Sequence, residues 1–144
     1  MSFDMLDPWS DAATIAGRLR QPGSFLVVLL AAESWCRKCR EFRPVFDRAA
    51  QGANAGEVWL WLDLEDHAEF VGDSIPDDLP WLLVYRDKVL WKSELATEAA
   101  LSGALDPGAV PSPAWPLHLD TPDRPDRPDR PNIRARLLQD DWGR

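Results

Sequence analysis

Both cysteines of this 144-residue chain lie in one pentapeptide, Trp35-Cys36-Arg37-Lys38-Cys39. The pentapeptide follows an unbroken apolar run at residues 25–32, which is typical of a strand buried on both faces. It precedes a segment at residues 40–51 whose apolar residues recur at helical spacing. A strand that delivers Cys-x-x-Cys to the start of a helix predicts a dithiol–disulfide redox site, because the unpaired N–H groups and the dipole of that helix end stabilise a thiolate.

The composition excludes several classes of function. The formal net charge of −8 argues against nucleic acid as a partner, and the longest apolar run, eight residues, is too short to cross a membrane. The first twenty residues have no basic stretch followed by an apolar one, so a cytoplasmic location is expected, where a cysteine pair is more commonly redox-active than structural. No metal is expected, because a structural zinc site usually has four ligands and the only histidines are His67 and His118.

Helices and further strands are predicted on both sides of the motif. Asp7-Pro8 is typical of a helix start, and helical spacing continues to about Arg20. Apolar strands are expected at residues 58–62 and 81–85, with an antiparallel return at 89–91. Weaker patterns predict an edge strand at 1–6, a solvated acidic strand end at 63–66, a short helix at 67–71, and a last helix at 95–105 with core contacts at Leu95, Ala99, Leu101 and Leu105.

The composition changes at residue 106. Residues 106–144 hold eight of the thirteen prolines and a Pro-Asp-Arg repeat at 122–131, which favours extended backbone and cannot bury a core. Asn132 can cap a short helix beyond the repeat. We therefore divide the chain into a body, residues 1–105, and a Pro-rich extension, residues 106–144. Three interpretations of the extension stay open: a disordered solubilising tail, a segment that docks on the body or on a second copy, or one that binds another protein.

Residues 1–105 resemble the thioredoxin family. The Trp-Cys-x-x-Cys pattern at 35–39 matches the tryptophan and cysteine pair of that family. Pro44, five residues after the second cysteine, matches the proline that kinks the active-site helix, and Leu79-Pro80 matches the cis-proline that faces the cysteines. The order of the predicted elements matches as well. The resemblance implies an α/β thioredoxin fold, with a central mixed sheet of four to five strands flanked by helices.

The resemblance also implies thiol–disulfide exchange that needs no cofactor besides the cysteine pair. Cys36 would be the attacking thiolate and Cys39 the resolving thiol. The partners would be protein disulfides and an unidentified reductant. A substrate strand would bind at four residues around the pair: Trp35, Leu79, Pro80 and Trp81. An alternative for Trp81 is that it fills core space beside the small Ala32.

The residues between the cysteines depart from the family. Arg37-Lys38 stands where the family usually has Gly-Pro. The body is acidic, with ten basic and seventeen acidic residues, yet half of its basic residues cluster near the motif: Arg37, Lys38, Arg40, Arg43 and Arg48. Because cations near Cys36 favour its thiolate, Arg37 and Lys38 are candidate tuning residues that predict a less reducing dithiol than that of an ordinary thioredoxin. The alternative is that both are merely solvated.

Two buried positions depart as well. Leu30 stands where the family has a buried aspartate, six residues before the first cysteine, and Ala32 stands at the second active-site tryptophan. Without that aspartate Cys39 lacks a candidate proton acceptor, which predicts slow reduction of substrates. A function of a different class therefore stays open, a thioredoxin-fold protein-binding or chaperone module with little redox activity.

Overall fold

The protein's structure, a computed structural model, describes residues 6–8, 10–52, 56–67, 78–87, 89–102, 118–119 and 133–138. In chain order its elements are α1 (Ala12–Leu19), β1 (Phe25–Ala31), α2 (Arg37–Ala50), β2 (Glu57–Asp63), β3 (Trp81–Arg86), β4 (Val89–Leu95), α4 (Glu98–Ser102), β5 (His118–Leu119) and α5 (Ile133–Leu137).

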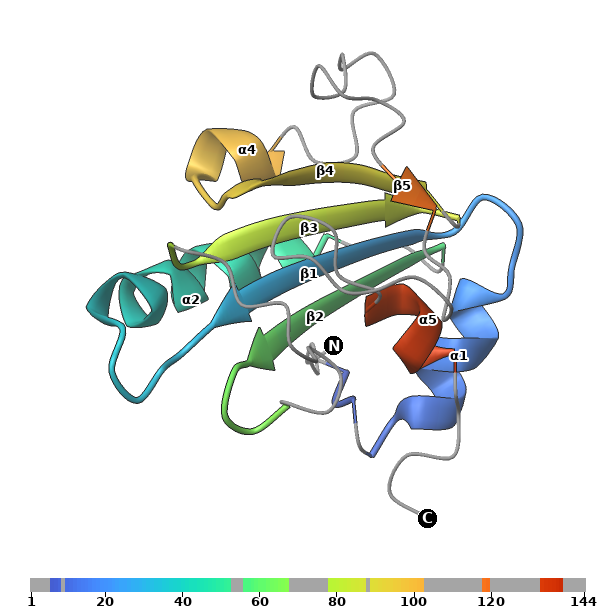
Figure 1. Ribbon diagram of the computed structural model, residues 1–144, viewed down its shortest axis with the longest axis horizontal. Helices are drawn as coiled ribbons and strands as arrows, with labels where there is room; N and C mark the ends of the chain where they lie inside the picture. The colour runs from blue at the N-terminus through green and yellow to red at the C-terminus, as the bar shows by residue number, and fades with distance from the viewer. Residues whose placement is uncertain are drawn as a thin grey trace.

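The strands form one mixed sheet in the order β2-β1-β3-β4-β5 (Figure 1). β1 pairs in parallel with β2 and antiparallel with β3, and β4 pairs antiparallel with both β3 and β5. Residues 26–31 of β1 are each at most 1% exposed, as expected for an apolar strand with a layer on either face. The structure confirms the predicted α/β class, a mixed sheet flanked by helices.

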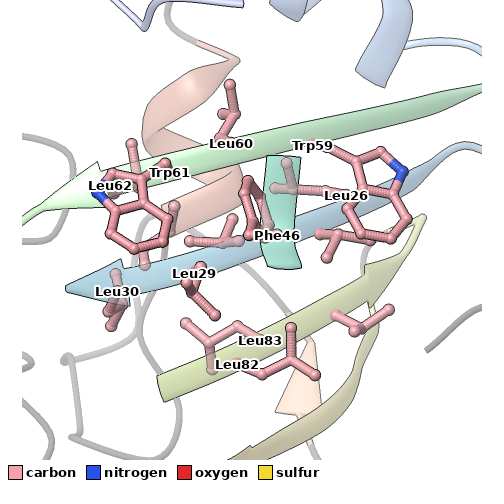
Figure 2. Close-up of a cluster of buried hydrophobic side chains, with 14 of the residues drawn as sticks. Leu26, Leu29, Leu30, Phe46, Trp59, Leu60, Trp61, Leu62, Leu82 and Leu83 are labelled. Atoms are coloured by element: carbon pink, nitrogen blue, oxygen red, sulfur yellow. The ribbon is translucent and has the colours of Figure 1, made fainter. Parts of the chain in front are cut away.

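Helices pack on the two faces of the sheet. On one face, α2 places Phe46 against Trp59 and Trp61 of β2, with ring centroids 5.8 and 5.7 Å apart (Figure 2). Because side chains alternate along a strand, Leu60 and Leu62 point to the other face, where α1 contacts β2. The sheet therefore separates two apolar layers. The aromatic layer anchors α2, the helix that begins directly after Cys36 and contains Cys39.

α5 packs beside α1 (Figure 1). Ile133 and Leu137 are 0% and 2% exposed and belong to the same core as the sheet. Arg134 Nη2 donates a hydrogen bond to the carbonyl oxygen of Leu19 over 2.8 Å. Residues 133–138 thus lie docked on the body, whereas the Pro-Asp-Arg repeat falls outside the described residues and the division of the chain after residue 105 stays a prediction.

Two helices begin at other residues than predicted. α1 begins at Ala12 instead of Pro8, because Asp7 caps a separate turn in which its Oδ1 accepts from the Ser10 N–H over 2.9 Å. α2 begins at Arg37, three residues before the predicted start, since the Cys36 side chain already acts as its N-cap. The helix therefore includes three of the five residues of the motif.

The prediction for the last helix of the body was wrong at its start. β4 continues to Leu95, which pairs with Trp81, so α4 begins only at Glu98. Leu95 is 38% exposed and Ala99 is exposed, so neither is a core contact, whereas Leu101 is buried. The predicted contact of Leu105, residues 1–5 of the edge strand and residues 68–71 of the short helix lie outside the described residues.

Candidate functional site

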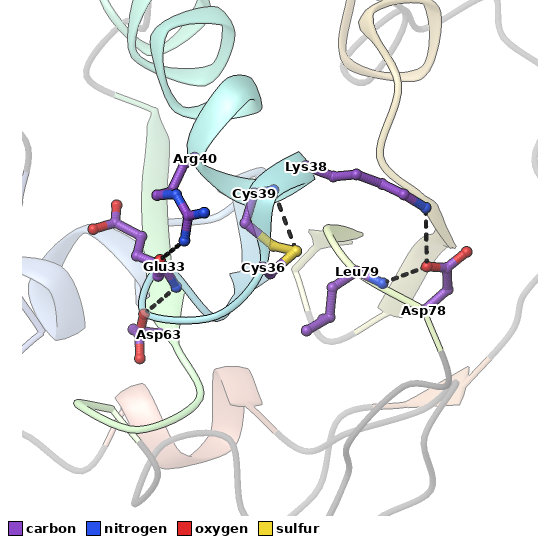
Figure 3. Close-up of a disulfide and its surroundings, with 8 residues drawn as sticks. All are labelled: Glu33, Cys36, Lys38, Cys39, Arg40, Asp63, Asp78 and Leu79. Atoms are coloured by element: carbon purple, nitrogen blue, oxygen red, sulfur yellow. Dashed lines mark hydrogen bonds and ion pairs between the residues drawn. A yellow bond between two sulfur atoms is a disulfide. The ribbon is translucent and has the colours of Figure 1, made fainter.

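The two cysteines form a disulfide across the first turn of α2 (Figure 3). Their Cα atoms are 5.3 Å apart, and the Cys39 N–H donates to Cys36 Sγ over 3.3 Å. Cys36 is half-buried, while Cys39 is 0% exposed. A substrate can therefore reach Cys36, and the helix N-terminus directs a backbone N–H at its sulfur, where it would stabilise a thiolate. This placement agrees with Cys36 as the nucleophile and Cys39 as the resolving thiol, roles that remain predictions.

Main-chain hydrogen bonds hold the loop that carries Cys36. The Cys36 N–H donates to the Ala32 carbonyl over 2.8 Å, and the Glu33 N–H donates to Asp63 Oδ2 over 3.0 Å. Asp63, the last residue of β2, is only 7% exposed, and its Oδ1 accepts from the Glu65 N–H over 2.9 Å. Asp63 is therefore not the solvated strand end expected from the sequence, but a buried acceptor for two loops. The apolar strand before Asp63 was the sequence signal for burial, but the loop that covers the carboxylate is placed there only by the fold.

Two arginines of α2 hold the same loop from the other side. Arg40 Nη1 donates to the Glu33 carbonyl oxygen over 2.7 Å, and Arg43 Nη1 lies 2.9 Å from Glu33 Oε1. The Arg43 guanidinium also pairs with Asp47 and lies 4.7 Å from the centroid of the Trp61 ring. Part of the basic cluster thus positions the loop before Cys36, a role that the sequence did not indicate.

The cations between the cysteines both have acidic partners. Arg37 Nε lies 3.1 Å from Glu41 Oε1, and Lys38 Nζ lies 3.7 Å from Asp78 Oδ1. All four side chains are more than half exposed, so these pairs contribute little to stability. Their carboxylates offset part of the positive field at Cys36. Three of the five cations of the basic cluster, Arg37, Lys38 and Arg43, are therefore paired with carboxylates in the fold. The tuning role of Arg37 and Lys38 stays a prediction.

The predicted substrate-binding residues lie at the same end of the sheet as the disulfide. The Leu79–Pro80 peptide bond is cis, and both residues are buried. Asp78 directly precedes Leu79, so its ion pair with Lys38 joins the redox motif to the cis-proline segment. Trp81 opens β3 half-buried, and its Nε1–H donates to Ser93 Oγ over 3.0 Å, which ties the indole to β4.

The remaining positions that were compared with the family differ in exposure: one is exposed and two are buried. Trp35 is 63% exposed, so it offers apolar surface directly beside Cys36. Leu30 and Ala32 are 0% exposed. Leu30 lies between Leu62 and Trp81 in the register of the sheet, so its side chain serves the core at the position where the family has an acid.

The two histidines lie in different elements of the described structure. His67 Nδ1 accepts a hydrogen bond from the Asp63 N–H over 2.9 Å, which makes it part of the turn after β2. His118 lies in β5. Among the described residues, no group of three or more His, Cys, Asp or Glu side chains could hold a metal ion. No helix in this part of the chain has the length and apolar character that a membrane span requires.

Comparison with known proteins identifies the fold. Neither a protein-family model nor a curated protein sequence matches the chain. Among solved structures, the human ERp44 zinc-bound form is similar over 72% of this chain, with a TM-score of 0.52 and 17% sequence identity. This chain covers only 31% of that one. Since ERp44 has a thioredoxin fold, the likeness shows that the present chain has the same fold, and at this identity it shows the fold alone.

Proposed function

We propose that this protein is a thiol–disulfide oxidoreductase that exchanges its Cys36/Cys39 pair with disulfides of protein substrates. The observation that carries the proposal is the Cys36–Cys39 disulfide at the start of α2 in a thioredoxin fold. One cysteine of the pair is accessible and the other is buried. That asymmetry suits a reaction in which one sulfur meets the substrate and the second acts only within the protein.

The reaction has two steps. The Cys36 thiolate attacks one sulfur of a substrate disulfide, a Cys36–substrate disulfide forms, and the other substrate sulfur leaves as a thiolate that takes a proton from water. Cys39, after loss of its proton, attacks Cys36 Sγ and expels the second substrate thiolate. Two electrons pass from the protein dithiol to the substrate, and a dithiol donor such as dithiothreitol restores the reduced pair.

Insulin reduction by dithiothreitol tests this function. We expect the wild-type protein to accelerate the reaction and Cys36→Ser to abolish the acceleration, because serine cannot form the mixed disulfide. Pre-reduced Cys39→Ser, mixed with insulin after dithiothreitol has been removed, should still attack an insulin disulfide and should accumulate the mixed disulfide, which mass spectrometry detects. Equal rates for wild type and Cys36→Ser would contradict the proposed activity.

A second candidate function is a binding or chaperone module. Trp35 and Leu95 are the exposed large apolar side chains of the described residues, at 63% and 38%. Trp35 lies directly beside Cys36, so a protein bound there would cover its exposed indole. This candidate is favoured if Cys36→Ser leaves insulin reduction unchanged while Trp35→Ala weakens suppression of aggregation of an unfolded protein.

We further propose that the pair is less reducing than that of an ordinary thioredoxin. Arg37 and Lys38 lie in the first turn of α2 next to Cys36, and cations there favour the thiolate of the reduced form. Equilibration with glutathione should give a potential above about −270 mV. The double variant Arg37→Gly, Lys38→Pro should be more reducing than wild type. A wild-type potential at or below about −270 mV would contradict this prediction.

A further inference from the structure

One carboxylate joins the redox motif to the segment before the cis-proline (Figure 3). Asp78 Oδ1 lies 3.7 Å from Lys38 Nζ and accepts a hydrogen bond from the Leu79 N–H over 2.9 Å. The same oxygen therefore contacts a side chain from between the cysteines and a main-chain donor next to Pro80. We call this arrangement of Lys38, Asp78 and Leu79 the Asp78 bridge.

The main-chain donor in the Asp78 bridge lies outside the pairing of the sheet. The register of β3 with β1 and with β4 begins at Trp81. Pro80 has no N–H, and its carbonyl accepts from the Ala96 N–H over 2.9 Å. The Leu79 N–H is thus a backbone donor just before a strand, beside the disulfide, that is bonded to a side chain. An extended peptide that adds to a strand needs donors of this kind.

We propose that the Asp78 bridge determines which disulfides react, because Asp78 occupies the Leu79 N–H and Lys38 holds it there. A peptide substrate must displace the carboxylate before its own carbonyl can accept from Leu79. A small disulfide without a peptide backbone needs no such exchange. The proposal rests on the proposed function, and it assigns Lys38 and Asp78 a role in substrate selection.

The bridge is suited to reversible displacement. The Lys38 and Asp78 side chains are 70% and 53% exposed, so water replaces their contact readily. Exposed pairs of this kind are also weakened by salt. The bridge therefore lowers the rate of reaction with peptide substrates without blocking it. This decrease in rate becomes smaller as ionic strength rises.

The test compares two substrates of the reduced protein, insulin and the neutral disulfide of mercaptoethanol. The measured quantity is the second-order rate constant for insulin divided by the second-order rate constant for the small disulfide. The small disulfide reports the reactivity of the Cys36 thiolate alone, so the ratio cancels any change in the pKa of that thiol. We expect Asp78→Ala to raise the ratio about three- to tenfold, the size expected for loss of one competing hydrogen bond and one exposed pair. Lys38→Met should give a smaller rise.

A matched control exists at the opposite end of the sheet. Asp87 Oδ1 accepts from the Gly23 N–H over 2.8 Å, so it too is a carboxylate on a main-chain donor. Asp87 has a positive φ of 51°, which asparagine tolerates well. Asp87→Asn should leave the ratio unchanged. An unchanged or lower ratio in Asp78→Ala would overturn the proposal.

A second measurement separates this proposal from the proposed function. Amide hydrogen exchange at Leu79, followed by NMR, should be faster in Asp78→Ala than in wild type, because the acceptor is gone. Equal exchange in the two proteins would overturn the bridge itself. If wild type reacts with neither disulfide, the proposed function fails, and the exchange measurement still decides whether Asp78 protects Leu79.

Discussion

The two ends of β1 join distant parts of the chain in different ways. At the Phe25 end, Arg134 is 6% exposed and donates to the Leu19 carbonyl, which also accepts from the buried Ser24 hydroxyl over 3.1 Å. At the Cys36 end, buried Asp63 also holds the Glu33 N–H, but the contact between the redox motif and the cis-proline segment is the exposed Lys38–Asp78 pair. A buried bond leaves an unsatisfied group when it breaks, whereas an exposed pair exchanges its partner for water. The contact with α5 at the Phe25 end is therefore built to stay closed, whereas the Lys38–Asp78 contact at the Cys36 end can exchange with water.

The largest expected effect is on the closed end. Ile133→Ala removes a side chain that is 0% exposed and packs between α5 and the core. We expect the free energy of unfolding to fall by about 2–4 kcal/mol, because truncation leaves a cavity. Urea unfolding measures it, and Leu138→Ala at a half-buried position of the same segment is the control. Equal losses for the two variants would mean that α5 adds little to the core.

A smaller effect is expected for the buried guanidinium. Arg134→Met should lower the free energy of unfolding by about 1–3 kcal/mol, since the Leu19 carbonyl keeps only its bond from Ser24. Arg20 Nη2 makes a similar bond to the Leu138 carbonyl over 3.0 Å, but Arg20 is exposed. Arg20→Met should therefore cost less than Arg134→Met in the same urea titration. The reverse order would contradict the contrast between buried and exposed contacts.

The smallest effect is expected at the exchangeable end. Arg37→Met breaks the Arg37–Glu41 pair, whose side chains are 85% and 64% exposed. The basic residue precedes the acidic one, which is the weaker order for a helical pair four residues apart. The free energy of unfolding should change by less than about 0.5 kcal/mol. A loss above about 1 kcal/mol would show that this end also contributes to stability.

The strands of the central sheet were predictable because their signal is local. Unbroken apolar runs placed β1, β2 and β3 within one residue of their observed bounds. The start of α4 was not predictable in this way, since β4 continues through polar residues only because β3 pairs with them. Leu95 therefore lies in a strand, although its own neighbourhood is typical of a helix.

Only those parts of the candidate site that belong to a sequence motif were predictable. The cysteine pair follows from the residues of the chain, and the cis-proline follows from their resemblance to the thioredoxin family. The partners of the charged residues do not, because Lys38 and Asp78, or Arg43 and Glu33, meet only after the strands have placed them. Asp63 was misjudged for the same reason, since its burial depends on the loop that folds over it.

The docking of α5 on α1 can take place only after almost the whole chain has been synthesised. The bond between Arg134 and Leu19 joins residues 115 positions apart. At about 5–20 residues added per second, a ribosome needs on the order of ten seconds between them. During this interval the apolar side of α1 has no α5 to cover it. The nascent chain therefore exposes this surface after all the central strands have been made, and a chaperone that binds apolar segments has time to act there.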